Sequence, residues 1–109
     1  MKIQFLETSQ PGLSWMISYY EDNPQLDRDR AFLNFDSTLE YMKDHPRKKE
    51  TFGGFSDVWE KKINYTAYSF LYTIRNSTIF VIDVRDQRGH RSAEALRYFK
   101  IELARKYGL

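Results

Sequence analysis

Basic side chains that suit phosphate chemistry gather in the second half of the chain. Lys61 and Lys62 are adjacent, and a second group follows later: Arg85, Arg88, His90 and Arg91. Arginine and lysine neutralise phosphate charge, and histidine titrates near neutral pH, so the set has the composition of a phosphoryl-transfer site. It equally has the composition of a surface that binds nucleic acid or an acidic protein.

The same residues have an ordinary structural interpretation. In an extended strand Lys61 and Lys62 point to opposite faces, so at most one lines a given site, and both fit solvated edge lysines. The arginines after residue 84 equally fit a solvated turn. A single loop histidine such as His90 is usually solvated. Residue types alone therefore leave catalysis, binding and plain solvation open.

Charge is distributed unevenly along the chain. The net charge is +2, but residues 1–46 carry four basic and eight acidic side chains, and the remainder has a balance of +6. This polarity favours an anionic partner for the C-terminal half. With two histidines and no cysteine, the sequence offers no metal ligand set, and we expect no cofactor. The lack of cysteine and of a long apolar run leads us to expect a cytoplasmic protein that does not contact a membrane.

The first half of the chain predicts one strand and two helices. Alternating apolar residues favour a strand over residues 2–8. Apolar residues at helical spacing then predict a first helix with the stripe Leu13, Met16, Ile17 and Tyr20. A second helix carries the stripe Phe32, Phe35, Leu39 and Met42, and it ends before Pro46.

From Val58 onward the apolar period changes to two. Segments 58–63, 67–74 and 78–84 are predicted strands, and the last reads as a central strand covered on both faces. Asn76 suits a tight reversal before the last strand because asparagine tolerates a left-handed backbone. Ser92 is a suitable N-cap for a final helix over about 92–107. We predict an α+β fold of order β-α-α-β-β-β-α, with the helical hairpin packed on one face of a small curved, mainly antiparallel sheet.

Two further predictions concern the interior. Tyr68, Phe70 and Tyr72 share one face of their strand, and we expect them to pack beneath the helical hairpin rather than to stack a base. Asp83 lies within the apolar run of the last strand. If it faces inward, we expect a structural ion pair with Arg75 or Lys62.

The run from Trp59 to Arg88 carries a resemblance to a known family. It contains an aromatic strand, Ala67–Ile74, an aliphatic strand, Ile79–Val84, and then Asp86-Gln87-Arg88. With the preceding strand and helical hairpin, this order resembles the RelE/ParE superfamily of bacterial toxins. The resemblance covers residues 1–91 of a single domain spanning 1–109, and the helix at about 92–107 is an addition to it.

The resemblance implies the toxin of a type II toxin–antitoxin pair, neutralised by a cognate antitoxin and open to higher-order assembly with it. One branch of the family cleaves messenger RNA on the ribosome, and the other poisons DNA gyrase. The nuclease branch carries an arginine after the aromatic matched by Tyr68, where this chain has Ser69. We therefore favour a ParE-like toxin that binds its target, and whether the chain is an enzyme stays open.

Three hypotheses follow. In the favoured one, a cationic rim binds the target through Arg85, Arg88, Arg91 and Lys61. The alternative is a RelE-like endoribonuclease whose scissile phosphate is surrounded by Lys61, Lys62, Arg85, Arg88 and His90. A third hypothesis is a toxin-like binding module that is not toxic. The terminal helix has several possible roles: it packs on its own domain, covers a sheet edge, pairs with a second copy or accepts the antitoxin.

Overall fold

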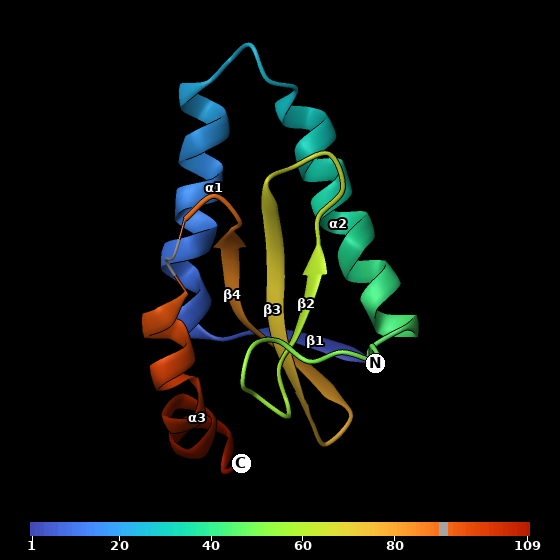
Figure 1. Cartoon of the computed structure of the whole chain (residues 1–109), viewed down its shortest axis with the longest axis vertical. Coiled ribbons are helices and arrows are strands. Elements are labelled where there is room, and N and C mark those ends of the chain that lie inside the picture. Colours follow the sequence, from blue (N-terminus) through green and yellow to red (C-terminus); the bar gives the residue numbers. More distant parts are fainter. Residues whose placement is uncertain (90–91) are drawn as a thin grey trace.

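The computed structural model describes residues 1–89 and 92–109, and its elements follow the predicted order (Figure 1). The first half contains β1 (Lys2–Phe5), a short 3-10 turn η1 (Glu7–Ser9), α1 (Gln10–Asp22) and α2 (Arg28–Asp44). The second half contains β2 (Trp59–Lys62), β3 (Tyr68–Arg75), β4 (Thr78–Asp86) and α3 (Ala93–Tyr107). The α+β class and the β-α-α-β-β-β-α order are thus confirmed, with η1 as a small addition.

The four strands form one sheet in the order β1-β4-β3-β2. β4 and β3 are antiparallel, as are β3 and β2, whereas β1 runs parallel to β4. The sheet is therefore mainly antiparallel, as predicted, and β4 is an inner strand as its apolar run indicates. The register shifts by one residue between Leu71, which faces Asp83, and Tyr72, which faces Val81. This bulge leaves Ile82 without a partner residue in β3. As a result, Asp83 points to the same side of the sheet as Ile82.

The helical hairpin covers one face of the sheet, which we call the hairpin face. Met16 and Tyr20 of α1 and Met42 of α2 are buried there against Tyr68, Phe70, Tyr72, Ile79 and Val81 of the sheet. The predicted stripes hold except at Ile17, which is exposed. The side chain of Asp27 caps α2 by accepting a 3.0 Å hydrogen bond from the Arg30 amide. The prediction that the aromatic stripe of β3 packs under the hairpin is confirmed.

The opposite face of the sheet, which we call the α3 face, is covered in part by the terminal helix. Phe99 and Leu103 of α3 are buried with Leu71, Phe80 and Ile82. Of the roles left open for this helix, the structure supports packing on its own domain. Ser92 occupies the N-cap position, but its side chain makes no capping hydrogen bond. The loop between α1 and α2 lies at one end of the long axis, and the C-terminus lies near the other (Figure 1).

The reversal between β3 and β4 needs a left-handed backbone at both central residues. Asn76 has φ of 48° and Ser77 has φ of 61°. Two successive positive φ values match the right-handed twist of the flanking strands, which is the geometry of a tight hairpin. The predicted reversal is confirmed at Asn76, and Ser77 adopts the same conformation at a higher steric cost.

Candidate functional site

Arg88 lies on the hairpin face, just beyond the end of β4. Its guanidinium donates hydrogen bonds of 3.0 and 3.1 Å to the two carboxylate oxygens of Asp86. It donates another, of 3.2 Å, to the Tyr68 hydroxyl, and its Cζ lies 4.2 Å from the centre of the Tyr19 ring. Asp86 also accepts a 2.9 Å bond from the Trp15 indole. We call this group the Arg88 cluster: Trp15, Tyr19, Tyr68, Asp86 and Arg88.

The electrostatics of the Arg88 cluster are tightly coupled. Burial alone would raise the pKa of Asp86, but hydrogen bonds from Arg88 and Trp15 bring that pKa down to about 2. Its hydrogen bonds to Asp86 in turn raise the pKa of Arg88. Burial and the nearby Asp86 charge raise the pKa of Tyr68 to about 12. At neutral pH the cluster therefore holds a fixed ion pair between Asp86 and Arg88 beside the neutral phenol of Tyr68.

Arg85 points to the opposite face of the sheet from Arg88. It donates a 2.7 Å hydrogen bond to Glu60 on β2, and its Cζ lies 5.3 Å from the centre of the Phe52 ring. The same Glu60 oxygen accepts a 2.5 Å bond from the Ser69 hydroxyl. Arg85 and Arg88 are thus each held by a carboxylate on different faces, and they do not form a shared cationic rim.

Lys61 and Lys62 are likewise divided between the two faces, as the alternation of a strand predicts. Lys61 pairs in register with Phe70, and its ammonium lies 4.6 Å from the centre of the Tyr41 ring on α2. Lys62 pairs with Ser69 and is exposed. The structure therefore places Lys62 and Arg85 on the α3 face, and Lys61 and Arg88 on the hairpin face. The two remaining candidates, His90 and Arg91, lie outside the described residues.

Asp83 does not form the predicted ion pair with Arg75 or Lys62. Arg75 instead bonds Asp57 at 2.7 Å, because it faces Thr78 at the far end of β3 from Leu71, the residue that faces Asp83. Asp83 is 3% exposed, and one carboxylate oxygen accepts a 2.8 Å hydrogen bond from the Val84 amide. Burial raises the pKa of Asp83 to about 6, against the opposing influence of the Ser92 hydroxyl and the Val84 amide.

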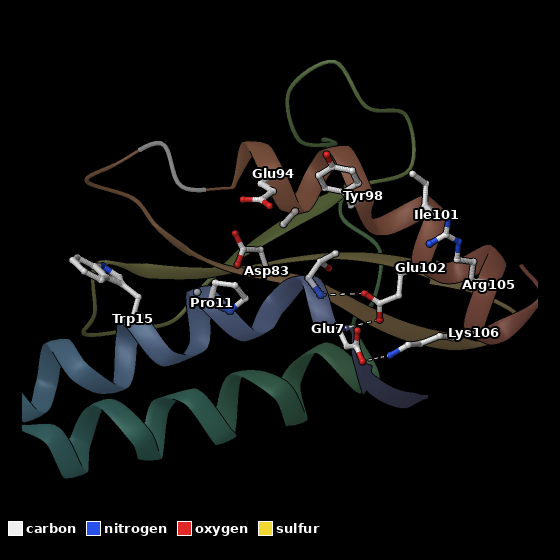
Figure 2. Close-up of a pocket in the computed structure, with 13 residues that line it drawn as sticks. Glu7, Pro11, Trp15, Asp83, Glu94, Tyr98, Ile101, Glu102, Arg105 and Lys106 are labelled. Atoms are coloured by element: carbon white, nitrogen blue, oxygen red, sulfur yellow. Dashed lines mark hydrogen bonds and ion pairs between the residues drawn. The ribbon is translucent and has the colours of Figure 1, made fainter.

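Asp83 lies at the wall of a pocket of about 750 Å³ between the start of α1 and α3 (Figure 2). Gly12 of α1 approaches the strand here so closely that an added Cβ would overlap the Asp83 carboxylate and the Val84 carbonyl oxygen. Sequence reasoning identified Asp83 as unusual but missed the pocket. The pocket depends on where α3 packs, and the spacing of apolar residues in a helix does not specify its partner. A glycine in the first turn of α1 was the available signal for close packing.

The described part of the chain holds no group of three or more histidine, aspartate or glutamate side chains placed to bind a metal ion. In those same residues, no helix is both long enough and apolar enough to cross a membrane.

Comparison of the chain with family models, with curated proteins and with solved structures gave no match.

Proposed function

We propose that this chain is the toxin of a type II toxin–antitoxin pair and that it acts by binding a macromolecular target, with DNA gyrase favoured. A cognate antitoxin would neutralise it. The proposal is supported by the resemblance of residues 1–91 to the RelE/ParE superfamily and by the order of strand, helical hairpin and sheet. The basic balance of the chain after residue 46 favours an anionic target or partner.

Binding is favoured over RNA cleavage by one observation, the division of the basic side chains between two faces of the sheet. Cleavage needs several cations around one phosphate to neutralise the charge that develops on it. Here Lys61 and Arg88 lie on one face, and Lys62 and Arg85 on the other. Ser69, which stands where the nuclease branch carries arginine, donates its hydroxyl to Glu60. A single phosphate cannot reach both sets.

The Arg88 cluster is the surface that we propose for target binding. Its arginine side chain is 45% exposed, although its partner Asp86 is buried. Trp15 on α1 is 40% exposed beside it. Arginine, tryptophan and tyrosine are the residue types that most often dominate binding energy at protein interfaces. A guanidinium that is already fixed on a tyrosine ring also loses little conformational entropy when a target binds.

The test is induced expression in growing bacteria, paired with a plasmid assay using purified gyrase. We expect the unmodified chain to stop growth and to yield linearised plasmid. Arg88→Gln should reduce linearisation at least about tenfold, as expected for loss of a hot-spot arginine, whereas Arg85→Gln on the α3 face is the matched control and should retain it. Both variants must first be shown to fold by circular dichroism.

Two other outcomes separate the alternatives. Codon-phased cuts in messenger RNA would establish the RelE-like endoribonuclease. Unimpaired growth of cells that contain a well-folded, abundant chain would favour the third hypothesis, a toxin-like binding module that is not toxic. Either result would overturn the proposal.

A further inference from the structure

At one end of the pocket between α1 and α3, the acidic side chains already have partners. There Lys106 forms an ion pair with Glu7 (Figure 2). Glu102 accepts hydrogen bonds of 2.7 and 3.1 Å from the backbone amides of Glu7 and Thr8. These contacts join the last turns of α3 to η1. The carboxylates at this end are occupied in holding the fold together.

The other end of the pocket has carboxylates without a counter-ion. Asp83 of β4 and Glu94 of α3 both line it, at the end of the pocket that lies away from Lys106 in Figure 2. No basic side chain in residues 1–89 or 92–109 forms an ion pair with either of them. One Asp83 oxygen accepts a hydrogen bond from the Val84 amide, and the Ser92 hydroxyl is a second neutral donor to the carboxylate, so neither neighbour supplies a positive charge. A buried carboxylate left in this state costs free energy.

Asp83 cannot relieve this cost by moving. Its backbone lies at the bulge of an inner strand, and Gly12 of α1 packs directly against its carboxylate. The apolar walls beside it are Pro11 of α1, with Tyr98 and Ile101 of α3. Tyr98 is 44% and Ile101 is 45% exposed, so these walls are open to an incoming group.

We infer that this pocket binds a cationic group, an ammonium or a guanidinium on a short apolar stem, with Asp83 as its counter-ion. The cation would lie against the Asp83 carboxylate and near Glu94, and the stem would lie against Pro11, Tyr98 and Ile101. The chemistry is shared by free amines and by lysine or arginine side chains of a partner protein. The inference does not depend on the proposed function: Trp15 belongs to both the pocket lining and the Arg88 cluster, but the cation is held by Asp83 and Glu94, which lie outside that cluster.

The raised pKa of Asp83 agrees with this site. A carboxyl group whose pKa is raised by burial, and which lies at the wall of a pocket, is a frequent feature of functional sites. A bound cation would favour the ionised carboxylate and so offset the cost of burying it.

The test is a titration of the ¹⁵N-labelled full chain with three probes that share a stem: butylguanidinium, butylammonium and butanol. We expect saturable chemical-shift changes around Asp83 and Tyr98 with the two cations and none with butanol. Asp83→Asn should weaken cation binding at least about tenfold, as expected for loss of a charge-assisted hydrogen bond. Tyr98→Ala, at an exposed position that does not threaten folding, should weaken it a few-fold. Asp36→Asn, on the exposed side of α2, is the control and should bind as the unmodified chain does.

A blocked tripeptide, acetyl-Ala-Arg-Ala-amide, distinguishes the two sources of the cation. Tighter binding of the peptide than of butylguanidinium would identify a segment of a partner protein, and weaker binding would identify a free amine or guanidine. The inference is overturned if neither cation gives a saturable change, or if Asp83→Asn binds butylguanidinium within about twofold of the unmodified chain. Should Asp83→Asn fail to fold, unchanged binding by both Tyr98→Ala and Glu94→Gln would overturn it instead.

Discussion

On the hairpin face Arg88 pairs with Asp86, and on the α3 face Arg85 pairs with Glu60, yet the two pairs differ in what they do for the fold. The Asp86 side chain is 7% exposed and depends on its partners, whereas Glu60 is 27% exposed and keeps access to water. The α3 face also contains Asp83, a buried carboxylate with no cation among the described residues. We infer that the burial of the acid, rather than the presence of an ion pair, decides how much each of these two arginines stabilises the fold.

The largest expected change in stability comes from removing one buried phenylalanine on each face, which tests whether the two faces contribute equally. Phe70 on the hairpin face and Phe99 on the α3 face are both fully buried. Phe70→Ala and Phe99→Ala should each lower the free energy of unfolding by about 3–5 kcal/mol, the usual cost of removing a buried phenyl ring. Urea denaturation measures both. A loss below about 1 kcal/mol for Phe99→Ala would show that the packing of α3 contributes little to stability, unlike the packing of the hairpin.

The next effect concerns the pH dependence of stability. Because the pKa of Asp83 is raised to about 6 in the fold, its unfavourable contribution is full above pH 6 and disappears as pH falls toward 4. Asp83→Asn should therefore raise the free energy of unfolding at pH 7 by about 1–3 kcal/mol and remove the change between pH 4 and 6. Asp86, whose pKa is lowered to about 2, stabilises the fold above pH 4, and this contribution is lost from pH 4 to 2. Urea denaturation at a series of pH values checks both, and an unchanged profile in Asp83→Asn would contradict the assignment.

A smaller difference in stability is expected between variants that lack Arg88 and variants that lack Arg85. Arg88→Ala leaves Asp86 buried with only the Trp15 indole and the residue 88 backbone amide as donors, and it should cost about 1–2 kcal/mol. Arg85→Ala leaves Glu60 bonded to Ser69 and partly solvated, and it should cost less than about 1 kcal/mol. Thermal denaturation of the two variants under one condition makes the comparison. Equal losses would show that burial of the acid is not the deciding variable.

The smallest expected change in stability comes from a substitution in the turn between β3 and β4, which alters no residue on either face of the sheet. Ser77 holds a left-handed backbone in the turn between β3 and β4. Ser77→Gly should raise the free energy of unfolding by about 0.5–1 kcal/mol, since glycine adopts this conformation without steric cost. Its toxicity and cation binding should match those of the unmodified chain. A decrease in stability would mean that the serine side chain contributes to the turn.

Much of the fold was predictable because local patterns decide it. The stripes on α1 and α2, the alternation in β3 and the reversal at Asn76 depend on neighbours within a few residues, and these predictions are confirmed except at Ile17, which is exposed. The α3 partner was not predictable, because Phe99 and Leu103 define a buried stripe without specifying which surface buries it. The pocket beside Asp83 follows from that packing, so it escaped sequence reasoning as well.

The arrangement of the basic residues was predictable only in part. Strand alternation separates Lys61 from Lys62, and that prediction is confirmed by the register of β2 against β3. The same alternation does not reveal the partner of Arg85, because Glu60 lies on another strand. The ion pair expected for Asp83 was wrong for a related reason. Arg75 forms its ion pair with Asp57, which lies in the loop before β2. The position of a loop residue cannot be inferred from a periodic pattern.

We propose that this chain stops growth by binding a target rather than by cutting RNA. Primer extension on messenger RNA, taken minutes after induced expression and before growth has fully stopped, tests it most directly. We expect arrested growth with transcripts that are as intact as those of an uninduced culture. Cuts that appear at a fixed position within codons, and that disappear in a Lys62→Ala or Arg85→Ala variant, would contradict it.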